Sequence, residues 1–324
     1  MNERTPRVSI VTATYNRANV LRYTIASVLA STMTDWELLV IGDGTTDDTE
    51  SMVASFGDPR IRFHNLPGNV GEQSGPNNEG LRRARGRYVA FLNHDDLWFP
   101  DHLETALGTL DRTGAAIVFT LGLSVGEGGA TELLGAVPGG VYDGRVAVPA
   151  SLWVTTRAVQ QEVGGWRSYR DGYAVPSQNW LMRALRAGHT PRLAPRLTAL
   201  IVHDRRPGGY AERRSDQHRA YYERLAADPS LREAMLLEFA LHAQQQVNQL
   251  TVWPWLRRAL VNGTKRAGLL VGLSPMELPH LVRYGRWGGF LDARRRFRGL
   301  PKLGTPAPAR DHPRGHEARD EARG

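Results

Sequence analysis

Two neighbouring carboxylates follow an apolar run within residues 88–100, YVAFLNHDDLWFP. Residues 88–92 predict a buried strand, and Asn93, His94, Asp95 and Asp96 come directly after it. Adjacent carboxylates repel each other unless a positive charge lies beside them, and Mg²⁺ or Mn²⁺ takes such oxygen ligands, usually together with substrate phosphates. The pair therefore indicates a divalent-metal site. The alternative is a helix cap, a position at which Asp is common.

Strands that alternate with helices would bring several such strand ends together. Apolar runs predict strands at residues 8–13, 37–42, 61–65, 88–92, 115–120 and 197–202, and helical patterns separate the first five. This alternation predicts a mostly parallel sheet covered by helices, and ligands bind such sheets outside the carboxyl ends of the strands. The first, second and fourth strands lead into TATYNR, GDGTTDD and NHDD, so hydroxyl, amide and carboxylate groups are expected at one edge.

Residues 8–110 resemble the nucleotide-binding half of the family 2 glycosyltransferases. Three motifs carry the resemblance, in the family's order: VSIVTATYNR, WELLVIGDGTTDDT and GNVGEQSGPNNEGLRRARGRYVAFLNHDDLWFPDHL. The resemblance implies the α/β fold called GT-A, with a Rossmann-like, mostly parallel sheet flanked by helices and a helical C-terminal region. It also implies transfer of a sugar, with inversion, from a UDP-, dTDP- or GDP-sugar to a small-molecule or lipid-linked acceptor.

The resemblance assigns roles to the residues that match the family's motifs. Asp43 corresponds to the acid that contacts the nucleotide base, and Asp95 to the acid that holds Mg²⁺ or Mn²⁺ on the diphosphate, with Asp96 beside it. His203, after the last predicted strand, is a further candidate ligand, although a surface turn is the favoured explanation. The donor-binding residues implied in this way are Thr14, Tyr15, Asn16, Arg17, Asp43, Asn78, Asn93, His94 and Asp95.

Three positions depart from the family's pattern. Asn93 replaces the first acid of the D-x-D element, which removes one negative charge and predicts weaker metal binding. His94 occupies the variable middle position, where a packing role is favoured over ligation. Asn77 replaces an arginine, so one cation near the phosphates is missing. The arginines within residues 82–85 are candidates to replace it, but an exposed helix face is the preferred explanation for them.

The catalytic base is the largest departure. An inverting transfer needs a carboxylate to take the proton from the attacking hydroxyl. The helix expected to carry this acid reads PSQNWLMRAL, with Asn179 or Ser177 at its position, and no Asp or Glu lies between Asp171 and Asp204. Three interpretations stay open: Asp171 is the base, the acceptor is already ionised, or the chain binds a nucleotide sugar without turning it over.

Composition and charge exclude some kinds of site and indicate where binding partners would contact the chain. The 324 residues contain no cysteine, which excludes disulfides, thiolate metal sites and cysteine nucleophiles, and a cytoplasmic location is expected, with membrane association open. The net charge of +8 is concentrated in residues 205–324. Residues 253–299, basic and rich in tryptophan, predict contact with an anionic membrane or, as the favoured alternative, a helical lid or homodimer contact. Nucleic-acid binding is not expected, because no reading motif accompanies the charge.

The expected domain organisation has four parts. Residues 1–120 form the nucleotide-sugar-binding half of the main domain and residues 121–209 its acceptor-binding half, followed by a helical region at 210–303 and a disordered tail at 304–324. Two other functions compete with a glycosyltransferase. One is a non-catalytic nucleotide-sugar-binding or scaffold protein. The other is a nucleotidyltransferase, which would want a glycine-rich basic loop after the first strand, and TATYNRANV is not one.

Overall fold

The structure is a computed structural model that describes residues 5–172, 175–203, 207–210, 212, 214–248, 256, 259–261, 263, 264, 267, 277–286 and 288–301. The expected disordered tail, 304–324, lies outside these residues, as do Trp253, Trp255 and Trp287 of the basic C-terminal segment. The segment for which membrane or dimer contact was predicted, 253–299, therefore lies partly outside the described residues. Within the described part of the chain, no helix is both long and apolar enough to cross a membrane.

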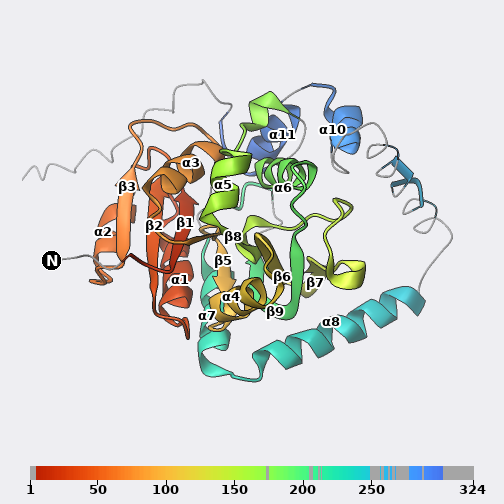
Figure 1. The fold of residues 1–324 in the computed structure, drawn as a ribbon, viewed down its shortest axis with the longest axis horizontal. Coiled ribbons are helices and arrows are strands. Elements are labelled where there is room, and N and C mark those ends of the chain that lie inside the picture. The colour runs from red at the N-terminus through yellow and green to blue at the C-terminus, as the bar shows by residue number, and fades with distance from the viewer. Residues whose placement is uncertain are drawn as a thin grey trace, which may run out of the picture.

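One sheet of nine strands runs through the molecule (Figure 1). Its order is β3-β2-β1-β4-β8-β6-β9-β5, and β7 pairs with β6. Strands β1 to β4 run parallel, so β1, β2 and β4 end at the same edge. The strands are β1 (Val8–Thr14), β2 (Trp36–Gly42), β3 (Ile61–Asn65), β4 (Tyr88–Phe91), β5 (Asp96–Trp98), β6 (Ile117–Gly126), β7 (Gly129–Leu134), β8 (Trp153–Thr156) and β9 (Arg192–Val202).

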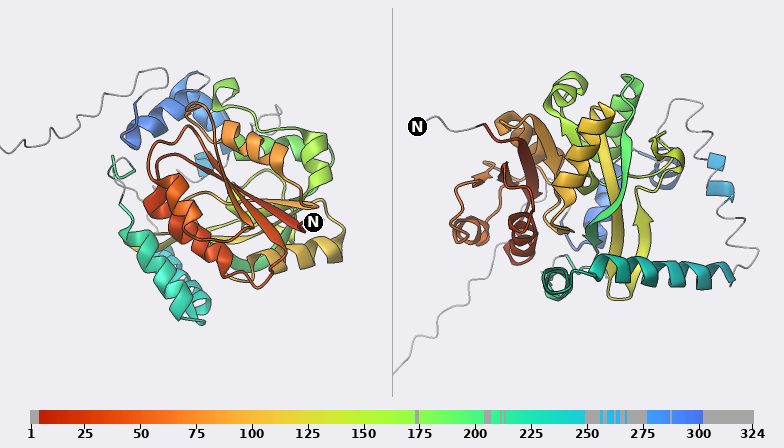
Figure 2. Two further views of the ribbon diagram at one scale, coloured as in Figure 1. Left: turned by 90° about the vertical axis from the view of Figure 1, so that its left-hand side faces the viewer. Right: turned by 60° about the horizontal axis from the view of Figure 1, so that its bottom comes forward.

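Helices cover the sheet and its ends. Helix α3 packs on β1 and β2, α4 on β6 and β9, α7 on α1, and α8 on β7 (Figure 2). At the top of Figure 1, α10 and α11 lie with α5 and α6, whereas α8 runs along the bottom. The helices are α1 (Ala18–Leu29), α2 (Thr49–Ala54), α3 (Ser74–Arg83), α4 (His102–Thr113), α5 (Arg157–Val163), α6 (Pro176–Arg186), α7 (Asp216–Ala227), α8 (Leu231–Asn248), α10 (Glu277–Tyr284) and α11 (Gly289–Phe297).

The sheet confirms the six predicted strands and adds three more. The predicted strands are β1, β2, β3, β4, β6 and β9, and the added β7 forms a hairpin with β6. Strands β5 and β8 were not predicted, because runs of three and four residues are too short for a periodic pattern. Strand β8 pairs antiparallel with both β4 and β6, so the sheet is mixed. Strand β6 crosses the boundary expected at residue 120, and the two expected halves share one sheet.

Aromatic side chains fasten the two expected halves together. Trp153 of β8 stacks on Trp166 with ring centroids 5.7 Å apart, and on Trp180 of α6 at 5.1 Å. Phe91 of β4 packs on Trp153 at 5.3 Å and on Trp166 at 4.7 Å. All four rings are buried, and aromatic pairs at such distances add to the stabilisation from burial. The cluster therefore fixes α6 against the strand whose end carries Asn93 and the acids.

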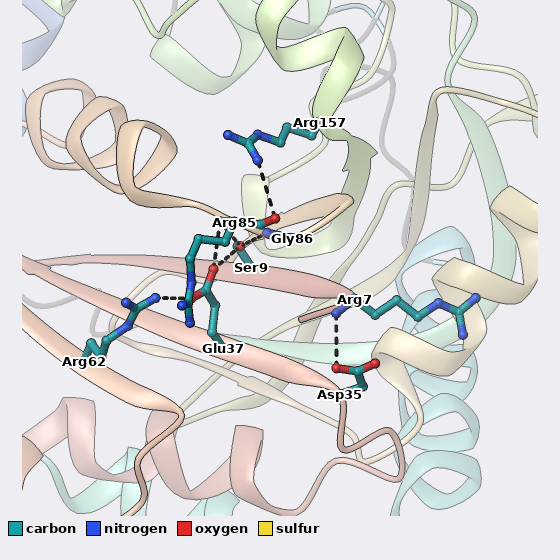
Figure 3. A network of polar contacts seen from close by, with 8 residues as sticks. All are labelled: Arg7, Ser9, Asp35, Glu37, Arg62, Arg85, Gly86 and Arg157. Atoms are coloured by element: carbon teal, nitrogen blue, oxygen red, sulfur yellow. Dashed lines mark hydrogen bonds and ion pairs between the residues drawn. The ribbon is translucent and has the colours of Figure 1, made fainter. Parts of the chain in front are cut away.

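A buried carboxylate lies at the amino ends of β1 and β2, at the opposite end of these strands from the motif residues (Figure 3). Glu37, 2% exposed, accepts hydrogen bonds from Ser9 Oγ at 2.6 Å and from the Arg85 backbone N–H at 2.9 Å. It also forms ion pairs with Arg62 and Arg85, and the Gly86 N–H donates to Ser9 Oγ at 2.8 Å. The network ties β1, β2 and β3 to the turn that precedes β4.

Gly80 lets α3 lie close on β1. A Cβ at this buried position would lie 2.3 Å from Val11 Cγ1, closer than unbonded atoms permit. Gly80→Ala is therefore expected to lower the free energy of unfolding by about 2 kcal/mol, a typical cost of overpacking. Urea denaturation measures the effect. As the control, Gly108→Ala on the exposed side of α4 meets open space and should stabilise by about 0.5–1 kcal/mol. Equal losses in both variants would contradict the packing explanation.

Candidate functional site

A cavity of about 350 Å³ lies at the carboxyl ends of β1, β2 and β4. Residues that follow three different strands meet there, as expected for the edge of a sheet with parallel neighbours. His203, which follows β9, reaches the same cavity from the other half of the sheet. The predicted site residues that line the cavity are Thr14, Tyr15, Asp43, Asn93, His94, Asp95, Asp96 and His203.

Asp43 holds a loop in place at the wall of the cavity. Its Oδ1 accepts a hydrogen bond from the Val70 N–H at 2.7 Å, and its Oδ2 accepts one from the Gly71 N–H at 2.8 Å. Asn69 Nδ2 donates to the Asp43 carbonyl oxygen at 2.9 Å. Burial raises the pKa of Asp43, and the two backbone hydrogen bonds oppose that rise. The carboxylate is thus fixed in orientation and keeps lone pairs for a ligand in the cavity.

The structure explains why an amide precedes the two acids. Asn93 Nδ2 donates to Asp96 Oδ2 at 2.8 Å, and Ser151 Oγ donates to the same oxygen at 2.5 Å. A carboxylate at position 93 would repel Asp96 across this distance. Asp96 is 1% exposed, and its burial, together with the negative charge of Asp95, raises its pKa well above the usual range. Asp96 is therefore engaged within the protein, and its predicted role as a metal ligand has little support from this geometry.

Asp95 is the acid that stays ionised. Its side chain is 23% exposed, and its Oδ2 lies 3.8 Å from His94 Nε2. Burial would raise the pKa of Asp95, but the positive charges of His94, Arg298 and Arg17 hold that pKa below its usual range. Because burial lowers the pKa of His94 itself, the lasting cations near Asp95 at neutral pH are the two arginines. Asp95 therefore presents a charged oxygen to the cavity.

Asn16 and Arg17 are not among the residues that line the cavity. Asn16 has a left-handed backbone (φ 50°), and its Oδ1 accepts hydrogen bonds from Thr45 Oγ1 and the Thr46 N–H, both at 2.7 Å. Arg17 is 3% exposed, and its Nη1 donates to the Tyr210 carbonyl oxygen at 3.1 Å. Both residues organise segments next to the site. Their contact with a nucleotide stays a prediction.

Three further predicted residues also lie outside the cavity wall. Asn78 exchanges two hydrogen bonds with the backbone of Trp166, at 2.7 and 2.9 Å, and so ties α3 to the loop after α5. Asn179 Oδ1 accepts a hydrogen bond from Arg183 Nε at 3.1 Å. Asp171 ends the short 3₁₀ helix Tyr169–Asp171 and is exposed. Of the three positions considered for the catalytic acid, Asp171 and Asn179 thus do not line the cavity, whereas Ser177, which has no carboxylate, does.

Metal binding at this site would depend mainly on one carboxylate. Among the described residues there is no group of three or more His, Asp or Glu side chains that could hold a metal ion. A donor set of this size still fits Mg²⁺, which is usually bound through one or two carboxylates plus substrate phosphates. Asp95 supplies the carboxylate, and His203 lies in the same wall. Weaker metal binding as a consequence of Asn93 stays a prediction.

The sequence reasoning missed one side of the cavity. That side is formed by Glu72, Tyr210 and three arginines of α11 and its end, Arg294, Arg295 and Arg298. The only signal was the basic run ARRRFR at residues 293–298, which composition assigned to a membrane contact or a lid. A run of basic residues does not indicate which part of the fold it will contact. Its position at the cavity could therefore not be predicted from the local sequence.

The arginines considered as substitutes for the missing cation do not line the cavity. Arg82 and Arg83 pair with Glu79 on the same helix, and Arg82 is 66% exposed. Arg85 pairs with Glu37 at the opposite end of the strands. The preferred explanation, an exposed helix face, is confirmed for Arg82.

Comparison with known proteins places the strand-end motifs in one family. Residues 9–133 match the model of the family described as glycosyl transferase family 2. An uncharacterized glycosyltransferase of Rickettsia typhi is 36% identical over 111 residues, which cover 34% of this chain and 34% of that protein. The UDP-Glc:alpha-D-GlcNAc-diphosphoundecaprenol beta-1,3-glucosyltransferase WfgD of Escherichia coli is 34% identical over 112 residues, 35% of this chain and 44% of that protein. The matches thus span less than half the length of these relatives.

Solved structures share the fold over a longer part of the chain. The structure of Staphylococcus aureus TarS 1-349 in complex with UDP-GlcNAc covers 68% of this chain and 71% of its own, with a TM-score of 0.52 and 16% identity. The mannosyltransferase PcManGT of Pyrobaculum calidifontis, in complex with GDP-Man and Mn²⁺, covers 90% of this chain and 87% of its own, with a TM-score of 0.50 and 17% identity. At these identities the likeness shows the fold, and the predicted GT-A architecture is confirmed.

Proposed function

From the match of residues 9–133 to the model of glycosyl transferase family 2, we propose that this chain is a member of that family and transfers a sugar from a nucleoside-diphosphate donor to an acceptor. The observation that carries the proposal is that Asp43 and Asp95, from two motifs far apart in sequence, line one cavity at the sheet edge. WfgD is named for transfer to a lipid-linked sugar diphosphate. By this likeness we propose a lipid-linked acceptor for this chain, with a small-molecule acceptor as the alternative.

The proposed donor lies along the strand ends. The base of the donor contacts Asp43, the rest of its nucleoside lies along Thr14 and Tyr15, and its diphosphate lies at Asp95. All four residues line the cavity. Asp95 would hold Mg²⁺ or Mn²⁺, with His203 in the same wall, and the Mn²⁺ in the PcManGT complex supports this choice of cation. Such an ion, when bound, stabilises the negative charge that develops on the departing diphosphate.

The acceptor's attacking oxygen is proposed to arrive already ionised, as in a phosphate or a carboxylate. Neither Asp171 nor Asn179 lines the cavity, so neither is placed to remove a proton there. Asp171→Asn is then expected to keep kcat within about twofold of wild type, as for other exposed substitutions. Steady-state release of nucleoside diphosphate measures this. A fall of about 100-fold, the size of a lost general base, would instead identify Asp171 as the base.

A donor panel tests the proposed function as a whole. UDP-, dTDP- and GDP-sugars are added with and without Mg²⁺ or Mn²⁺, and both thermal unfolding and slow hydrolysis of the donor are followed. One donor class is expected to raise the unfolding temperature, since ligand at 100 times its Kd stabilises by about 2.7 kcal/mol. The same class should be hydrolysed. Absence of both effects for every donor would overturn the proposal.

A non-catalytic nucleotide-sugar-binding or scaffold protein is the second candidate. The observation in its favour is that, among the described residues, neither α6 nor the loop before it brings a carboxylate to the cavity wall. Thermal stabilisation by one donor without turnover, for hydroxyl, phosphate and carboxylate acceptors alike, would support the scaffold and exclude the transferase.

A cytoplasmic location, at the membrane when the acceptor is lipid-linked, belongs to the same proposal. Residues 253–299 are proposed to contact either an anionic membrane or a second copy of the chain. Co-sedimentation with anionic liposomes at low salt supports the membrane contact, and a dimer by light scattering without liposome binding supports the other.

A further inference from the structure

Helix α11 brings positive charge to the cavity from outside the family-matched residues. It covers Gly289–Phe297, and Arg294, Arg295 and Arg298 all line the cavity. The helix is anchored there by packing: the ring of Phe290 lies 5.8 Å from that of Tyr169 and stacks on His280 of α10 at 4.4 Å. The arginines are therefore part of a packed wall, since α11 also contacts the 3₁₀ helix Tyr169–Asp171.

Arg295 hydrogen-bonds to the loop that contains Val70 and Gly71, which Asp43 also holds in place. It is 7% exposed, its Nη1 donates to the Gly71 carbonyl oxygen at 2.9 Å, and its Nε donates to the Pro301 carbonyl oxygen at 2.8 Å. Gly71 is one of the two residues whose N–H groups hold Asp43. Arg295 thus joins the C-terminal helix to the end of the cavity at which the nucleotide base is proposed to bind.

Arg298 also lines the cavity, and its positive charge is one of those that lower the pKa of Asp95. Its Cζ lies 4.8 Å from the ring centroid of Tyr210, and Arg17 Cζ lies 4.5 Å from the same centroid. Within the described part of the chain, the Arg298 guanidinium makes no hydrogen bond and no ion pair. Burial and the charge of Arg294 lower the pKa of Arg298, and the opposing effects of Tyr210 and Asp95 do not offset this, so the cation is incompletely compensated. A cation in this state gains free energy when an anion binds beside it.

We propose that Arg298, with Arg294 beside it, forms an anion site that binds the diphosphate of the donor without needing a metal ion. The inference rests on the proposed function, which places a nucleoside diphosphate in this cavity. Arginine suits this ligand, because its planar guanidinium donates two parallel hydrogen bonds to phosphate oxygens and stays charged in a partly buried site. Because Arg82, Arg83 and Arg85 are paired with glutamates, α11 supplies the charge that α3 does not.

The test measures nucleotide binding in EDTA, so that activity is not the readout. Titration calorimetry compares UDP, dTDP and GDP, each against its nucleoside, and inorganic pyrophosphate. Arg298→Gln should lower the affinity for the best nucleoside diphosphate and for pyrophosphate by about 10- to 100-fold, because a charge-assisted hydrogen-bonded pair is lost. The affinity for the nucleoside should not change. Arg298→Lys, which keeps the charge, should recover part of the loss.

Arg296→Gln is the matched control. Arg296 lies on the same helix, carries the same charge and is exposed, and it does not line the cavity. Its substitution should leave every affinity within about twofold, as for other surface changes. Thermal unfolding of both variants confirms that each is folded.

Three results would overturn the inference while leaving the proposed function intact. They are unchanged diphosphate affinity in Arg298→Gln, an equal loss for nucleoside and nucleoside diphosphate, and wild-type binding that appears only with Mn²⁺. Failure of the wild-type protein to bind any of the nucleotides, with or without Mn²⁺, would instead overturn the donor site and the anion site together.

Discussion

Asp95→Asn is expected to lower kcat about 1000-fold at saturating donor, because the lost carboxylate would hold the metal ion that stabilises the departing diphosphate, which is worth several kcal/mol in the transition state. Asp95 is the one acid at the end of β4 that remains ionised and reaches the cavity, since Asn93 and Ser151 engage Asp96. The amide keeps the shape of the side chain. The variant should therefore fold normally, and its activity should no longer respond to added Mn²⁺.

Rates of nucleoside diphosphate release, measured across a Mn²⁺ titration, check this result. Asp111→Asn is the control, because Asp111 is 52% exposed and pairs with Arg7 on the surface. Loss of an exposed pair is worth about 0–1 kcal/mol of stability and should leave kcat unchanged. If Asp95→Asn kept more than a tenth of the wild-type kcat and the same Mn²⁺ response, Asp95 would not be the metal-binding acid.

The part of the site that could be predicted is the part that depends on strand ends. Thr14, Asp43 and Asp95 each follow an apolar run of clear strand type, and parallel pairing of those strands places their ends at one edge. Only the order of elements is needed for this conclusion. For the same reason β1 to β4 agree with prediction, whereas β5 and β8, which are short and pair antiparallel, do not stand out in the sequence.

The rest of the site depends on contacts between residues far apart in the chain. Ser151 reaches Asp96 across 55 positions and decides that this acid is buried and hydrogen-bonded. Arg295 reaches Gly71 across 224 positions. No local pattern states which loop a serine will meet or which wall a basic helix will form. The net charge therefore pointed to the basic segment that contains α11, but it did not predict that its arginines line the cavity.

Glu37→Gln is expected to lower the free energy of unfolding by about 3 kcal/mol at pH 7, the cost of breaking a buried ion pair. Glu37 is 2% exposed and is held by Ser9, Arg62 and Arg85 at the amino ends of β1 and β2 (Figure 3). An amide of the same shape removes the charge and leaves both arginines without their carboxylate. Because this network lies away from the cavity, kcat of the folded variant should not change.

The pH dependence of this loss distinguishes charge from packing. Burial alone would raise the pKa of Glu37, but the hydrogen bonds from Ser9 and Arg85 and the charge of Arg62 outweigh it and lower that pKa below 4.5. A carboxylate with a lowered folded-state pKa stabilises above its unfolded pKa, and the contribution disappears as the pH falls through the folded value. Urea denaturation compares the free energies of unfolding of wild type, Glu37→Gln and the exposed control Glu50→Gln. The loss of unfolding free energy in Glu37→Gln relative to wild type should be full at pH 7 and should shrink progressively below about pH 4.5. A difference that stayed constant down to pH 3 would mean that Glu37 stabilises by shape and not by charge.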